Sequence, residues 1–157
     1  MKRFLKVFFA VILSALFCLL ALCACGGGGG ETTASIVYSD KDGANTIVVI
    51  QVDETDGKAN VFNAMEYLKT QGELSYVAQD GAYGAFITEI NGKGAAQTSA
   101  NSGYSWMLYT SDQDYANPDM GTVEYGGNTY GSAAVGASSV IVKTGEYYIW
   151  YYTAWSY

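Results

Sequence analysis

Apolar residues follow two different periods along the middle of the chain. Residues 46–53 are β-branched and nearly all apolar, which predicts a central strand. From Asn60 to Gln71 the spacing changes to i, i+3, i+4 and i+7, which places four apolar side chains on one helical face: Val61, Ala64, Met65 and Leu68. Asn60 can cap the start of this helix, and Gly72 can end it.

The remaining apolar pattern predicts strands. Residues 85–90 and 104–110 alternate or are rich in aromatic side chains, and residues 139–142 and 146–153 read as a final hairpin. Residues 76–84 read as a loop. The Gly-rich insertion 111–137 contains a candidate small hairpin at residues 122–130, and residues 35–38 form a candidate edge strand. One helix among about six strands predicts an α+β domain, with the helix packed on an antiparallel or mixed sheet and a second small hairpin.

The amino terminus has the pattern of a secretory signal. Lys2, Arg3 and Lys6 precede an apolar run that extends to Ala24. Its end, Leu22-Cys23-Ala24-Cys25, resembles the bacterial lipobox, in which the last cysteine becomes lipidated. We therefore expect a signal peptide at 1–24, a lipidated Cys25 with a glycine-rich tether at 25–45, and a domain at 46–157. The alternatives are a cleaved, secreted chain and a membrane-spanning helix.

Two acyl chains on Cys25 would anchor the protein stably to a membrane. The orientation set by basic residues at the amino terminus places the rest of the chain outside the cytoplasm. The expected location is thus the extracellular face of the cell membrane, and the membrane itself is the first expected partner.

Composition excludes several kinds of chemistry. The 133 residues that follow the signal contain no histidine, and their only cysteine is Cys25, so imidazole and thiol catalysis are excluded in the domain. Their 15 acidic and five basic residues give a formal net charge of −10, which argues against nucleic acid as a partner. The acidic groups match no calcium-loop or glycosidase motif, at 40–45 or at Asp112, Asp114 and Asp119. We expect no metal, no catalytic cofactor and no enzymatic activity.

Four stretches in order resemble the transcobalamin-like C-terminal domain family. They are the helix start 60–68, the strand and turn 84–92, the tryptophan strand 103–109 and the final segment 140–152. Three features depart from the family pattern. Residues 110–112 replace an Asn-Gly turn after the tryptophan strand, the insertion that follows is longer than usual, and Gly145-Glu146 replaces a Gly-Asp pair. The resemblance implies a β-grasp-like, non-catalytic module that binds a ligand. A corrinoid such as cobalamin is one implied ligand, although this chain has no room for the helical barrel that completes that site in transcobalamin.

Carried over residue by residue, the resemblance implies a ligand site at Tyr104, Trp106, Tyr109, Asn91 and Gly92. Each has a plainer interpretation. A tryptophan in the middle of an apolar strand face usually packs in a core, and Asn-Gly is a common turn. The aromatic residues from Tyr147 to Trp155 have apolar neighbours on both faces, so half of them could form a binding surface.

Two functions remain open from the sequence. The first is capture of a small molecule, with a corrinoid as one candidate, for handover to a membrane transporter. The second is a protein- or cell-wall-interaction module without a small ligand. A concavity of several hundred Å³ lined by the aromatic residues would favour the first, and a flat aromatic face the second.

Overall fold

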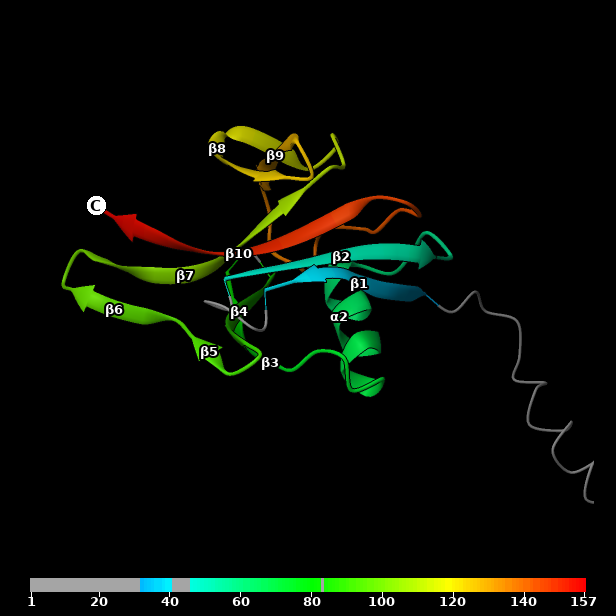
Figure 1. Ribbon diagram of the computed structural model, residues 1–157, viewed down its shortest axis with the longest axis horizontal. Coiled ribbons are helices and arrows are strands. Elements are labelled where there is room, and N and C mark those ends of the chain that lie inside the picture. The colour runs from blue at the N-terminus through cyan, green and yellow to red at the C-terminus, as the bar shows by residue number, and fades with distance from the viewer. Residues whose placement is uncertain (1–31, 41–45, 83) are drawn as a thin grey trace, which may run out of the picture.

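The computed structural model describes residues 32–40, 46–82 and 84–157. In these ranges the chain forms one helix and ten strands (Figure 1). Seven strands make one antiparallel sheet in the order β1-β2-β10-β7-β9-β8, with β6 added to β7, and the other three form a small sheet in the order β3-β4-β5. The bounds are β1 Thr33–Ser39, β2 Ile47–Glu54, α2 Val61–Thr70, β3 Tyr76–Gly81, β4 Gly84–Ile90, β5 Lys93–Gly94, β6 Ala96–Ser99, β7 Ser102–Thr110, β8 Ala116–Tyr125, β9 Asn128–Ala133 and β10 Tyr147–Ser156.

The predicted α+β, β-grasp-like class is wrong. The described residues are 59% strand and 8% helix, and the seven-stranded antiparallel sheet dominates the fold. The prediction failed because three polar segments pair as strands: β3, β6 and the β8–β9 hairpin. Every residue of β6 is exposed, so the segment has no apolar alternation that could reveal a strand.

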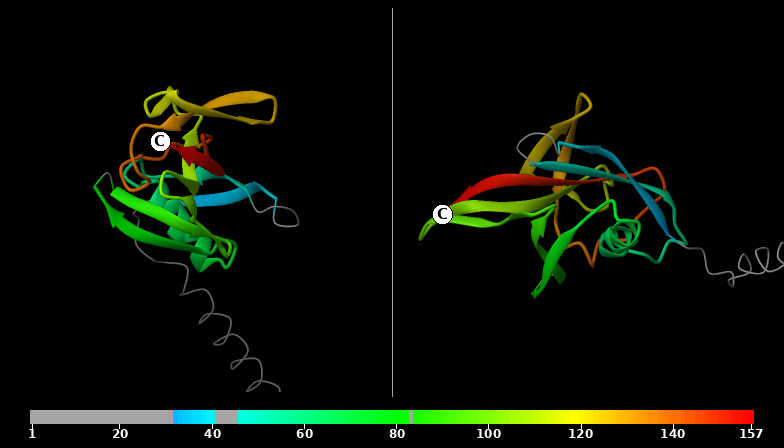
Figure 2. Two further views of the ribbon diagram at one scale, coloured as in Figure 1. Left: turned by 90° about the vertical axis from the view of Figure 1, so that its left-hand side faces the viewer. Right: turned by 60° about the horizontal axis from the view of Figure 1, so that its bottom comes forward.

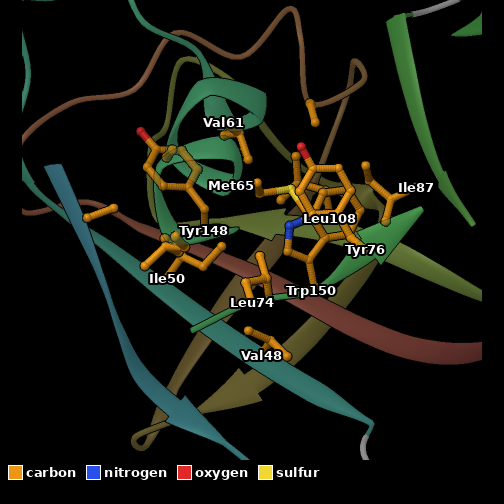
Figure 3. Packing of buried hydrophobic residues seen from close by; sticks show 14 of the residues in the cluster. Val48, Ile50, Val61, Met65, Leu74, Tyr76, Ile87, Leu108, Tyr148 and Trp150 are labelled. Atoms are coloured by element: carbon orange, nitrogen blue, oxygen red, sulfur yellow. The ribbon is translucent and has the colours of Figure 1, made fainter. Parts of the chain in front are cut away.

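The helix itself was predicted correctly. Asn60 caps α2 by accepting a hydrogen bond from the Asn63 amide, and the Asn63 side chain accepts one from the Asn60 amide in return. The apolar face lies in the main core with side chains from β2, β7 and β10. Figure 3 shows Val61 and Met65 close to sheet residues such as Ile50 and Trp150. The helix is thus held chiefly by burial of one face.

The last predicted hairpin is also wrong. Residues 139–142 do not pair with β10; they run along the helix start instead. The Val61 amide donates to the Val140 carbonyl at 2.9 Å, and the Val142 amide donates to the Ala59 carbonyl at 2.9 Å. Strand β10 therefore has both edges available, and it pairs with β2 on one side and β7 on the other. This makes β10 a central strand of the large sheet.

The second face of the large sheet is covered by the β8–β9 hairpin, which folds back over it (Figure 2). A small second core forms there from Val49, Tyr109, Val123 and Ile149, ringed by partly buried tyrosines. In the strand ladder, β9 pairs with β7 at two positions, Tyr109 with Ser132 and Thr110 with Gly131. The insertion predicted at 111–137 is therefore the cover of one sheet face, and its hairpin is longer than expected.

Strand β1 begins before the predicted domain start at residue 46. It pairs with β2 along its length, so the sheet starts at Thr33, inside the range assigned to the tether. At the end of β1, the Asp40 carboxylate accepts hydrogen bonds from the Thr46 and Ile47 amides. Burial alone would raise the pKa of Asp40, but these bonds outweigh it and lower that pKa. The signal peptide and Cys25 lie outside the described residues.

Candidate ligand-binding groove

Strand β7 is fully paired on one edge and only partly paired on the other. Strand β10 pairs with all of it, from Ser102 to Thr110. On the opposite edge, β6 reaches no further than Tyr104 and β9 begins at Tyr109. The edge from Ser105 to Leu108 thus has no strand partner in the described part of the chain. The sheet divides at this point, because β6 and the ends of β7 and β10 extend away from the rest as an arm (Figure 1).

An open groove of about 610 Å³ lies at this division. Because successive side chains point to opposite faces, Tyr104 approaches the groove from one face of β7 and Met107 from the other. Phe86 of β4 adds an exposed ring from the small sheet. The full lining consists of Phe86, Ala95, Ala96, Gln97, Tyr104, Ser105, Met107, Trp155 and Tyr157. It is largely apolar and contains no Asp, Glu, Lys or Arg.

Trp155 is positioned by a glycine on the neighbouring strand. It pairs with Gly103, and a Cβ atom placed on that glycine would come within 2.7 Å of the indole ring. Only a residue without a side chain allows the ring to approach the strand this closely. The ring of Tyr157 then lies 5.4 Å from that of Trp155, centroid to centroid. Two aromatic rings thereby form one side of the groove.

Tyr104 is oriented by a stack of aromatic rings. It lies nearly parallel to Tyr152, at 11° and 5.6 Å between centroids, and the Lys93 ammonium sits 4.6 Å from the centre of the Tyr152 ring. The Tyr152 hydroxyl donates to the Gly94 carbonyl at 2.9 Å, which fixes the ring that Tyr104 contacts. Tyr104 remains 42% exposed, so it presents a held but accessible ring.

The other two predicted aromatic residues lie in the cores. Trp106 is 2% exposed in the main core, where its indole N–H donates to the Lys93 carbonyl at 2.7 Å. Tyr109 is buried in the second core, where burial first and Tyr151 second raise the pKa of its hydroxyl. Neither residue lines the groove, so of the three predicted aromatic residues only Tyr104 does.

Asn91 and Gly92 form the turn between β4 and β5. Both have left-handed backbone angles, with φ of 49° and 80°, which is the conformation that Asn-Gly favours in two-residue hairpins. The Asn91 side chain accepts a hydrogen bond from the Ser75 amide at 3.1 Å. These two residues hold the turn and do not line the groove.

Of the nine lining residues of the groove, the site prediction named only Tyr104, and Trp155 belonged to the aromatic segment that could form a binding surface. The other seven were missed, although a usable signal extended from Trp155 to Tyr157. Trp155 and Tyr157 continue the aromatic alternation of β10 beyond the core, and an aromatic residue at an uncovered strand end is free to contact a ligand. Nothing in the sequence brings Phe86 to them, because that contact depends on how the small sheet packs against the large one.

The acidic loop after β7 is held by an internal cation. Lys143 Nζ lies 2.8 Å from an Asp112 carboxylate oxygen and 2.6 Å from one of Asp114. These hydrogen bonds raise the pKa of Lys143. Burial raises the pKa of Tyr148 to about 12. The Lys143 amide donates a hydrogen bond to the Tyr148 hydroxyl, which opposes this rise but does not cancel it. Among the described residues, no group of three metal-ligating side chains is close enough to hold a metal ion.

No family model matches the chain, and no curated protein or solved structure matches it. Membership of the transcobalamin-like family therefore stays a prediction. The described residues include no helix of the length and apolar character needed to cross a lipid bilayer.

Proposed function

We propose that this chain is a lipid-anchored protein of the extracellular membrane face that binds an uncharged ligand without converting it. The observation that carries this proposal is the open, aromatic-lined groove of about 610 Å³ at the division of the large sheet. Its volume falls within the range of small-molecule sites, roughly 300–1,000 Å³. A concave aromatic surface favours ligand capture over a flat contact face for a partner protein.

The lining supports binding rather than catalysis. Its side chains offer aromatic and aliphatic contact area and two neutral polar groups, Gln97 and Ser105. Apart from tyrosine hydroxyls, it includes no acid or base for neutral pH, and no lining histidine, lysine or carboxylate could activate the Ser105 hydroxyl as a nucleophile. A ligand would be held by stacking and by a few hydrogen bonds, which suits capture for handover to a transporter.

A corrinoid is one candidate ligand. Calorimetric titration of the fragment 31–157 with cobinamide and cobalamin tests it, since that fragment contains every described strand and the helix. A parallel thermal-shift screen of uncharged small molecules and oligosaccharides extends the test to other ligands. We expect at least one saturable ligand whose binding is lost in Tyr104→Ala.

Tyr38→Ala is the matched control. Tyr38 is 46% exposed, compared with 42% for Tyr104, and it also contacts a second tyrosine, Tyr125. It lies on β1, outside the groove. If no ligand in either assay depends on Tyr104, the proposed binding function is wrong and a protein-interaction role replaces it.

The anchor has its own test. Metabolic labelling of the full chain with a tagged fatty acid should mark the wild type and Cys23→Ala but not Cys25→Ala. Label that persists in Cys25→Ala would contradict lipidation at that residue.

A further inference from the structure

Charged residues are absent from the arm and from the parts of β7 and β10 that continue it into the packed body of the domain. Residues 95–111 and 147–157 contain no Asp, Glu, Lys or Arg, although the whole chain has 15 acidic and eight basic residues. The nearest cation, Lys93, is engaged over the Tyr152 ring and does not line the groove. A charged ligand would leave water here without gaining an opposite charge, and that loss is unfavourable. An anion would also be repelled by the net negative charge of the protein.

The arm is nevertheless not purely apolar. Gln97 and Ser105 face the groove, and β6 and the turn that follows it carry hydroxyl and amide side chains: Thr98, Ser99, Asn101 and Ser102. Ser105 is already buried, so the exposed amide of Gln97 is the group that a wholly apolar ligand would bury without a hydrogen-bond partner, which costs free energy. The groove therefore fits a ligand that has apolar faces together with neutral hydrogen-bonding groups at its edges.

An extended peptide would also offer neutral polar groups, but the geometry of the open edge opposes it. A strand that paired with β7 between Ser105 and Leu108 would meet β6 at Tyr104 and β9 at Tyr109. The free edge spans only four residues, about 14 Å at the usual rise per residue of a strand. A short ring-shaped ligand can occupy this space, whereas a continuous β-strand cannot pass through it.

We propose that the groove binds an uncharged glycan. Pyranose rings have apolar C–H faces that can lie on Trp155 and Tyr157, which share one face of the arm, and hydroxyl edges that can hydrogen-bond with Gln97. A neighbouring ring of the same glycan can reach Tyr104 on the other face across the open edge of β7. This inference rests on the proposed function, because it names the ligand class of the same groove. It places the specificity of the protein in the uncharged arm and not in the packed body.

The test compares three forms of the 31–157 fragment on an array of neutral and acidic oligosaccharides: wild type, Trp155→Ala and Tyr38→Ala. The wild type and Tyr38→Ala should retain the same neutral oligosaccharides. The affinity of Trp155→Ala for them should be about tenfold lower, as expected for the loss of one stacking ring. Gln97→Ala should also weaken binding, while circular dichroism reports whether each variant keeps its sheet.

The outcomes separate this inference from the proposed function. If acidic oligosaccharides bind best, or if only cobinamide, an apolar compound or a peptide binds in a Trp155-dependent manner, the glycan assignment is wrong and the groove is still a ligand site. If no compound of any class binds in a Trp155- or Tyr104-dependent manner, both proposals fail. Retention of neutral oligosaccharides that Trp155→Ala loses would support both.

Discussion

The two halves of strand β7 each carry aromatic or apolar residues and serve different purposes. The half from Trp106 to Thr110 is covered on one face by the helix core and on the other by the β8–β9 hairpin. In the half from Ser102 to Ser105, the Trp155 ring covers Gly103 on one face, whereas on the other face Tyr104 stays 42% exposed. An aromatic residue becomes a core anchor in one half and an accessible ring in the other. What lies above the strand, and not the residue type, decides its role.

The largest expected difference is between the tryptophans of the body and the arm. Trp106→Ala removes a fully packed side chain and the indole donor to the Lys93 carbonyl, so we expect a loss of about 3–5 kcal/mol in the free energy of unfolding. Urea unfolding followed by circular dichroism measures it. Trp106→Phe keeps most of the apolar volume and should lose less, about 1–3 kcal/mol. A loss below 1 kcal/mol in Trp106→Ala would show that the body is not packed around this residue.

Gly103→Ala should disturb the arm specifically. The added Cβ would lie 2.4 Å from the Ala96 carbonyl oxygen and 2.7 Å from the Trp155 ring, so the ring must move. We expect destabilisation of about 1–3 kcal/mol together with weaker ligand binding. Gly94→Ala is the control, because its nearest neighbours lie 3.6 Å away or further. Equal effects of the two substitutions on stability would contradict this view of Gly103.

The body and the arm should also differ in their response to pH. The folded-state pKa of Asp40 lies below its ordinary value of 3.8, so its contribution to stability is present above that value and is lost as pH falls through the folded pKa. Lys143 has a raised pKa, so its contribution is present below 10.5 and is lost at higher pH. Asp40→Asn should reduce the acid dependence by a small amount, because water partly screens this half-buried carboxylate. Thermal melts across the pH range measure it.

Ligand affinity should not follow these changes. The groove lining has no carboxyl, amine or imidazole side chain, so affinity should stay constant from about pH 5 to pH 9, below the ordinary tyrosine pKa. Calorimetry at several pH values with the best neutral oligosaccharide from the array checks this expectation. An affinity that changes several-fold across this range would indicate a charged group in the site.

Trp155→Ala should affect stability less than Trp106→Ala does. The ring lies over a strand at the end of the arm, is partly exposed and contributes to neither core, so the free energy of unfolding should fall by about 1 kcal/mol. Binding of the neutral oligosaccharide should weaken about tenfold at the same time. Destabilisation comparable to that of Trp106→Ala would mean that the arm is part of the packed body.

Local sequence patterns predicted the parts of the fold that depend on neighbouring residues. The Asn60 cap, the apolar face of α2 and the Asn91-Gly92 turn each follow from a few adjacent side chains, and strands β2, β4 and β7 follow from apolar runs. The class of the fold depends on pairing between distant segments. Strand β6 and most of β8 have polar sequences with no alternation, so their pairing comes from the strands beside them.

The candidate site shows the same limit. Tyr104 could be selected because it stands on an aromatic strand, but Trp106 stands two residues away on the same face and is buried. The difference arises because the small sheet and the helix cover only one half of β7. Phe86 joins the groove through that packing, and no local pattern places it there.

The most direct test of the account uses the indole N–H signals of the three tryptophans in an NMR titration of the 15N-labelled fragment. Trp106 and Trp150 lie in the main core, and Trp155 lines the groove. On addition of the neutral oligosaccharide that the array retains best, we predict a saturable shift of the Trp155 signal and little change in the other two. A shift at Trp106 or Trp150 with none at Trp155 would contradict the claim that the uncharged arm holds the ligand.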